Sequence, residues 1–121
     1  MRIEKGGKLS NHSPINNDIK RVFFDENNEL DYGDFAVYIY IAMHIQYSED
    51  GGTGTPNGKQ GYCYKTKVRI QGELGIGKDK LNRHIARLKA YGFIDSREVP
   101  NKYGGKPLEE YRLIDGWQSH I

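Results

Sequence analysis

The sequence predicts an α+β protein in which helices come first and a β-hairpin follows. Apolar residues recur at helical spacing in three separate segments. Near the C-terminus, two alternating runs, FIDSREV and LEEYRLI, flank the turn-forming pair Gly104 and Gly105. Because 121 residues amount to about one domain, these elements are expected to share a single core.

The composition describes a globular chain without a membrane segment. Apolar residues make up 36% of the sequence and charged residues 28%. No apolar run approaches the roughly 18 residues that a membrane helix needs, and the N-terminal stretch lacks the apolar segment of a signal peptide. A single cysteine, Cys63, cannot form an internal disulfide. We therefore expect a cytoplasmic protein with no membrane partner.

The first helix is expected over about residues 32–46, because Phe35, Ile39 and Met43 are spaced for one helical face. A polar, flexible arm at residues 1–18 precedes it. Between the two, the run at residues 19–24 is expected to form an edge strand or an extended segment packed on the core.

The segment that follows the first helix combines a loop with a short strand. Residues 48–61 contain five glycines and one proline, so they cannot form a regular element. Residues 61–65 (GYCYK) are predicted to be a short strand, on which Cys63 is expected to be buried and inert.

Two helices joined by a tight bend are predicted next. Thr66 can cap a helix over residues 67–74, and Gly75 can adopt the left-handed conformation that a tight turn demands. A second helix is expected over about residues 78–91 and should end at Gly92. Its apolar stripe consists of three residues at helical spacing: Leu81, Ile85 and Leu88.

The bend also has the spacing of a phosphate-binding loop, because Gly72, Gly77 and Lys78 fit G-x-x-x-x-G-K. That loop needs a hydroxyl after the lysine to hold magnesium, but Asp79 follows here. The rest of the chain offers no further strand–helix crossover. We therefore reject the nucleotide-hydrolase interpretation and expect no enzymatic activity, catalytic residue, metal or cofactor.

The positive charge is concentrated in one segment. Residues 65–106 carry eleven Lys and Arg against four Asp and Glu, a net charge of +7, whereas the rest of the chain carries seven against twelve, a net charge of −5. A regional positive field of this kind is typical of a nucleic-acid-binding protein. Solvated helix faces are the alternative explanation of the same charges.

Two helices with a sharp bend, followed by a hairpin, make a helix-turn-helix with a wing. The run GYCYKTKVRIQGELGIGKDKLNRHIARLKAYGFI resembles the winged helix-turn-helix of plasmid and phage replication initiator proteins. The matching positions are Leu74, Gly75, Arg83, Leu88, Gly92, Phe93 and Ile94. The resemblance covers residues 19–115, implies a three-helix core with a C-terminal wing, and leaves residues 116–121 as a tail. Gly77 departs from it, because the family has Ser or Thr at this cap.

Within this framework, the N-terminal half of the second helix of the pair is expected to enter the major groove. Arg83 can donate twice to guanine, Asn82 can pair with adenine, and Asp79 can accept from cytosine or cap the helix. Lys78 is expected to be exposed in the groove with them. Phosphate contacts are expected from the flanking cations: Lys65, Lys67, Arg69, Lys80 and Arg87. Lys102 and Lys106 would let the wing straddle the backbone or reach the minor groove. His84 is interpreted as a packed surface histidine and not as a metal ligand.

The resulting hypothesis is sequence-specific binding of double-stranded DNA by a homodimer. The resemblance favours plasmid or phage replication initiation, and a transcriptional repressor with the same fold is the alternative. Replication or transcription proteins are further expected partners. A protein-protein interaction module in a phage or plasmid complex is a separate alternative, which a weak dependence of binding on salt would favour.

Overall fold

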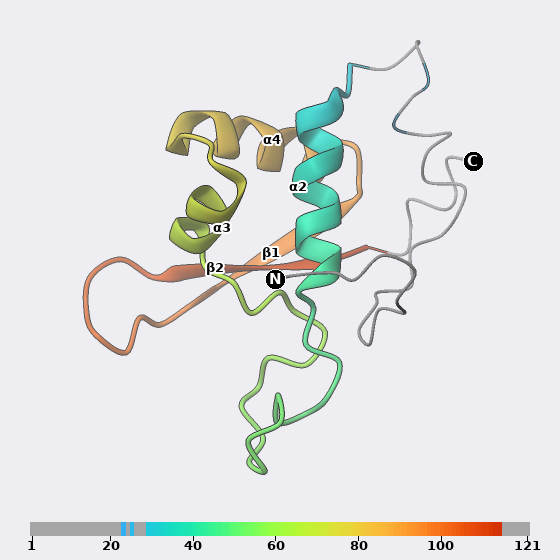
Figure 1. Ribbon diagram of the computed structural model, residues 1–121. Helices are drawn as coiled ribbons and strands as arrows, with labels where there is room; N and C mark the ends of the chain where they lie inside the picture. Colours follow the sequence, from blue (N-terminus) through green and yellow to red (C-terminus); the bar gives the residue numbers. More distant parts are fainter. Residues whose placement is uncertain (1–22, 24, 26–28, 115–121) are drawn as a thin grey trace, which may run out of the picture.

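The computed structural model describes Phe23, Asp25 and residues 29–114 of the chain. Within these residues, the protein is α+β, as predicted, with three helices followed by an antiparallel hairpin (Figure 1). In chain order, the elements are α2 (Tyr32–Met43), α3 (Lys67–Leu74), α4 (Lys78–Ala90), β1 (Ile94–Val99) and β2 (Leu108–Leu113). The predictions for residues 1–18 and 116–121 lie outside the described residues.

Helix α2 begins with a reciprocal pair of caps. The Asp31 carboxylate accepts a hydrogen bond from the Asp34 amide at 2.9 Å, and the Asp34 carboxylate accepts one from the Asp31 amide at 2.8 Å. The helix ends at Met43, three residues before the predicted end. It stops there because the chain after His44 is extended and bonds to residues 62–64 instead of continuing the helix.

Helix α2 is buried on most sides, as predicted, but one member of its predicted stripe is not. Phe35 and Ile39 pack partly buried against the core, whereas Met43 is 59% exposed. The fully buried residues include Val37, Tyr38 and Ile41, which lie outside that stripe. Apolar residues occur on nearly every side of this helix, so their spacing alone does not define the inner face.

The predicted strand at residues 61–65 is reduced to a single bridge between Ile45 and Cys63. The amide of Cys63 donates to the carbonyl of Tyr111 at 2.6 Å. This short stretch therefore bonds to β2 as well as to the segment that follows α2. Too few consecutive residues pair on either side to make a strand. Cys63 is buried, as predicted, and burial raises the pKa of its thiol.

The predicted helix pair is confirmed almost to the residue. The Thr66 hydroxyl accepts from the amide of Arg69 at the start of α3, and Gly75 ends the helix in the left-handed conformation with φ 65°. Ile76 packs partly buried in the bend. Helix α4 then ends at Ala90, one residue before its predicted end.

The core lies where α2, α4 and the hairpin meet (Figure 1). Its fully buried members come from all of these elements and include Ile41, Leu81, Leu88, Phe93 and Tyr111. Phe23 stacks on Phe93, with ring centroids 4.7 Å apart. Phe23 is the one described residue of the predicted run 19–24, and it packs on the core as expected but is helical instead of extended.

The hairpin confirms the predicted turn, with its strands in register from Ile94 opposite Leu113 to Val99 opposite Leu108. Gly104 and Gly105 both have positive φ in the connection, which extends beyond α3 in Figure 1. Among the described residues, no helix combines the length and the apolar character needed to cross a bilayer.

Candidate nucleic-acid interface

Helix α4 has one buried face and one face exposed to solvent. Its apolar stripe, Leu81, Ile85 and Leu88, is buried as predicted. Arg83 is exposed on the opposite side, and Lys78 is exposed at the first residue of the helix. The helix begins at Gly77, which provides no side-chain cap, so the amides of the first turn have no hydroxyl or carboxylate partner at that position. The outer face near the start of α4 therefore offers cations and backbone donors together.

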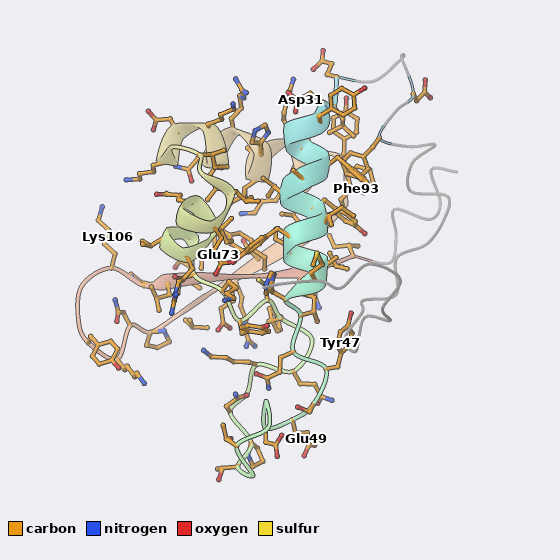
Figure 2. The ribbon with its side chains drawn as sticks, in the orientation of Figure 1. Asp31, Tyr47, Glu49, Glu73, Phe93 and Lys106 are labelled. Carbon is orange, nitrogen blue, oxygen red and sulfur yellow. The ribbon has the colours of Figure 1, made fainter. Side chains whose placement is uncertain are left out.

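Six cations have no ion-pair partner among the residues that the structure describes. They are distributed over α3, α4 and the connection of the hairpin, and all six were predicted as DNA contacts: Arg69, Lys78, Lys80, Arg83, Lys102 and Lys106. All of them are exposed. Figure 2 shows Lys106 extending away from the protein at the hairpin connection. These side chains can bind an external anion without first breaking an internal ion pair.

Three other predicted phosphate contacts lie in internal ion pairs. Each cation is within 3.5 Å of a carboxylate: Lys65 to Glu73 at 3.1 Å, Lys67 to Glu109 at 3.4 Å, and Arg87 to Asp31 at 3.1 Å and to Asp34 at 3.2 Å. A phosphate would have to compete with these carboxylates. The cations of the predicted site thus fall into a free group and a paired group.

Asn82 and Asp79 differ in accessibility. Asp79 is exposed in the first turn of α4, where its negative charge is favourable for the helix dipole. Asn82 is half-buried, and its Oδ1 is out of contact with solvent and has no hydrogen-bond partner in the described part of the chain. Arg83 is therefore better placed than Asn82 to reach a base edge.

His84 is the clearest correction to the sequence-based interpretation. It is a buried residue, 1% exposed, and not a surface histidine. Its Nδ1 lies 2.7 Å from Oδ1 of Asp34, which is itself fully buried in α2. The ring also packs against Gly33, where an added Cβ would lie 2.6 Å from Nε2 of His84. A glycine at this position of α2 is the only residue that leaves room for the ring.

Asp31, Asp34 and His84 place three possible metal ligands within 4.8 Å of one another. Arg87 donates to both carboxylates, so its guanidinium already supplies the positive charge that a cation would bring. Burial would raise the pKa of Asp31, but the Asp34 amide, His84 and Arg87 outweigh this effect and lower it. We therefore interpret the cluster as an ion-pair network that fixes α4 on α2.

A second network, centred on Glu109, holds the hairpin against α3 and α4. Its carboxylate accepts hydrogen bonds from Tyr111 at 2.5 Å, Lys89 at 3.0 Å and Ser96 at 2.9 Å. Burial would raise the pKa of Glu109, but these hydrogen bonds dominate and lower it to about 2. Lys67 of α3 pairs with the same carboxylate. The positions of the helices and of the hairpin are thus coupled.

Both networks were missed because they join different elements: His84 and Asp34 are 50 residues apart, and Glu109 is 20 residues from Lys89. One local signal was available: Asp31 and Asp34 have the spacing of a capping box, which predicts that Asp34 faces the start of its helix. No sequence signal identifies His84 or Arg87 as its partners.

Comparison of the chain with models of protein families, with curated proteins and with solved structures gave no match.

Proposed function

We propose that residues 29–114 form a winged helix-turn-helix that binds double-stranded DNA, with α4 as the recognition helix and the hairpin as the wing. The observation that carries this proposal is the distribution of the six unpaired cations over α3, α4 and the hairpin connection. In a winged helix, these are the supporting helix, the recognition helix and the wing. The four described cations outside these elements, Lys59, Lys65, Arg97 and Arg112, all pair with carboxylates.

The exposed start of α4 suits major-groove binding. Arg83 lies on the outer face, where a guanidinium can donate to O6 and N7 of guanine. Lys80, one turn before Arg83, and Lys78, at the first residue of the helix, are exposed and can neutralise phosphates. The uncapped amides after Gly77 can donate to a phosphate directly, in place of the hydroxyl that Ser or Thr supplies at this cap in replication initiators.

The hairpin connection can reach the neighbouring backbone or minor groove. Lys102 and Lys106 are exposed near the turn glycines, at the end of the hairpin that lies away from α2 in Figure 1. By the resemblance of the sequence, we place the activity in plasmid or phage replication initiation, with the chain acting as a homodimer on a repeated site. A repressor would use the same residues on a promoter.

Fluorescence anisotropy on labelled duplexes, tiled from the genetic neighbourhood of the coding sequence, tests the proposal. Tight binding to one duplex, steep in salt, is expected from an interface that neutralises phosphates. Arg83→Ala should weaken binding to that duplex by about 1–3 kcal/mol if it reads a base. Lys89→Ala is the matched control, because Lys89 lies on the same helix but pairs with Glu109.

Equal, weak binding to every duplex, with no difference between the two variants, would reject base readout by α4. Binding that hardly changes with salt would instead favour a protein partner. Light scattering of the free protein and of the complex would give the number of chains on the DNA, which tests the homodimer separately.

A further inference from the structure

A cavity of about 440 Å³ lies between the hairpin and the loop that precedes α3. The loop forms one wall with Asn57, Gly58 and Lys59, and the hairpin forms the rest with Arg97, residues 99–103, Leu108 and Glu110. In Figure 1, this loop lies below the hairpin, on the side opposite α3. We call this space the hairpin cavity.

The hairpin cavity is built by strand register and held open by one arginine. Arg97 lies opposite Glu110 and Val99 opposite Leu108, so alternation along the strands places these four side chains on one face of the hairpin. Arg97 pairs with Glu110 at 2.8 Å and also donates to the carbonyl of Gly58 at 2.6 Å. These bonds tie the loop to the hairpin and fix the width of the space between them.

The charge of the hairpin cavity favours an anion. Lys59, Arg97 and Lys102 line it, against one carboxylate, Glu110. Arg97 already neutralises Glu110, and Lys59 lies 3.9 Å from the same carboxylate. Lys102 has no ion pair in the described part of the chain, and its ammonium lies 5.1 Å from the ring centre of Tyr103. An anionic group of a ligand can therefore bind Lys102 directly, and it can bind Lys59 in exchange for the long contact of that side chain with Glu110.

The remaining lining favours a flat ring. Tyr103 is 87% exposed, and Leu108 is 38% exposed, so an aromatic face and an aliphatic side chain meet the solvent together. Val99 and Pro100 extend this apolar surface. Asn101 accepts from the amide of Tyr103 through its Oδ1 at 3.0 Å, and its Nδ2 has no acceptor among the residues that the structure describes, so it can donate to a ligand. A planar ring with acceptor atoms matches these groups.

We propose that the hairpin cavity binds one nucleotide, with its base against Tyr103 and the apolar surface and its phosphate between Lys59 and Lys102. A volume of about 440 Å³ falls within the range of roughly 300–1,000 Å³ usual for small-ligand sites. Stacking on an exposed aromatic ring beside lysines is also how proteins bind unpaired nucleotides. The same chemistry therefore fits a free nucleotide or an unpaired nucleotide of a DNA strand, and it does not require α4 to bind duplex DNA.

Isothermal titration calorimetry of the full chain with deoxyadenosine monophosphate tests the site. Inorganic phosphate and deoxyadenosine, titrated separately, should each bind more weakly than the nucleotide, because each lacks half of the contacts. Tyr103→Ala should weaken nucleotide binding about fivefold to 150-fold, the range expected for loss of one stacked base. Lys102→Gln should weaken binding of the nucleotide but not of deoxyadenosine.

Lys106→Gln is the matched control, because Lys106 lies in the same exposed connection but does not line the hairpin cavity. It should bind deoxyadenosine monophosphate as the unchanged protein does. An equal loss in Lys106→Gln and Lys102→Gln would overturn the proposal, because a diffuse positive field would then explain the binding. Phosphate binding as tight as nucleotide binding would also overturn it, because the base would then contribute nothing.

The two sources of the nucleotide are separated by a second titration, with a DNA hairpin that carries one unpaired adenosine and with the fully paired version. A preference for the unpaired adenosine that is abolished in Tyr103→Ala identifies a DNA strand as the source. Binding of the free nucleotide without that preference identifies a small-molecule ligand. If neither the free nucleotide nor the DNA hairpin with the unpaired adenosine bound, the proposal would be overturned. Arg83→Ala should leave nucleotide binding unchanged, so failure of duplex recognition and failure of this site are distinguishable.

Discussion

His84 of α4 and Asp34 of α2 are joined by a buried contact, with 2.7 Å between Nδ1 and Oδ1. Both residues are at most 1% exposed, and Arg87 extends the contact to the second oxygen of Asp34 at 3.2 Å. Two residues one turn apart on α4 thus hold one carboxylate at the start of α2. In the proposed function, this contact sets the angle at which α4 presents Arg83.

Replacing Asp34 with alanine should destabilise the protein strongly. The change removes the carboxylate that partners both His84 and Arg87, and breaking a buried ion pair typically lowers the free energy of unfolding by about 3–5 kcal/mol. Asp31→Ala is the matched control, because its side chain is 47% exposed and its removal should cost about 0.5–2 kcal/mol, as for a helix cap. Urea denaturation gives both values, and equal losses would contradict the assigned role of Asp34.

The helical glycines Gly33 and Gly72 should respond in opposite ways to alanine. Alanine is favoured over glycine by about 1 kcal/mol inside a helix, and an added Cβ at Gly72 meets no atom within 4 Å, so Gly72→Ala should stabilise the protein. At Gly33, the same Cβ would overlap the buried His84 ring, so Gly33→Ala should lower the free energy of unfolding by about 1–3 kcal/mol. Thermal unfolding of the two variants compares them, and stabilisation by both would show that His84 can move aside.

Acid should weaken the contact between the hairpin and the helices through Glu109. Its pKa is lowered from 4.5 to about 2 in the folded state, so its contribution is complete above about pH 4.5 and is lost as the pH falls towards 2. The contribution is on the order of 1 kcal/mol, because water screens this partly exposed carboxylate. In Glu109→Gln, the free energy of unfolding should therefore fall less steeply between pH 4.5 and pH 2 than in the unchanged protein.

Glu98→Gln provides the control for acid denaturation. Glu98 lies directly opposite Glu109 in the hairpin but is exposed and has no ion pair among the described residues. Its replacement removes one negative charge opposite Glu109 and leaves the hydrogen bonds of Glu109 in place. If Glu109→Gln gave the same slope as Glu98→Gln, the hydrogen bonds from Tyr111, Lys89 and Ser96 would not stabilise the ionised form.

The predictions that succeeded depend on neighbouring residues in the sequence. Thr66 and Gly75 bound α3 as expected, because a cap and a left-handed turn are determined within a few residues. The hairpin likewise follows from alternation and from its two turn glycines. The stripe of α4 was visible because polar residues separate its apolar positions.

The predictions that failed depend on contacts between distant segments. A histidine beside an apolar stripe is a surface residue unless another element covers it. The sequence does not show that α2 covers His84 or that Asp34, 50 positions away, contacts its ring. The ion pairs of Lys65 and Lys67 were not predicted either, because their carboxylate partners are selected by packing and not by spacing; the predicted DNA contacts of these two lysines stay predictions. The candidate site was thus predicted as a set of cations, but its division into free and paired members required the structure.

The division of the predicted-site cations into free and paired members predicts how substitutions should change the salt dependence of DNA binding. Each neutralised phosphate contributes about −0.9 to the slope of log affinity against log salt. Lys78 has no ion-pair partner in the described part of the chain, so Lys78→Gln should make the slope shallower by about 0.9. Lys67 lies 3.4 Å from Glu109, so Lys67→Gln should change the slope much less. Fluorescence anisotropy on one duplex at several salt concentrations measures both slopes. If the two variants changed the slope equally, the ion pair of Lys67 would have to open when DNA binds, and the paired cations would belong to the interface after all.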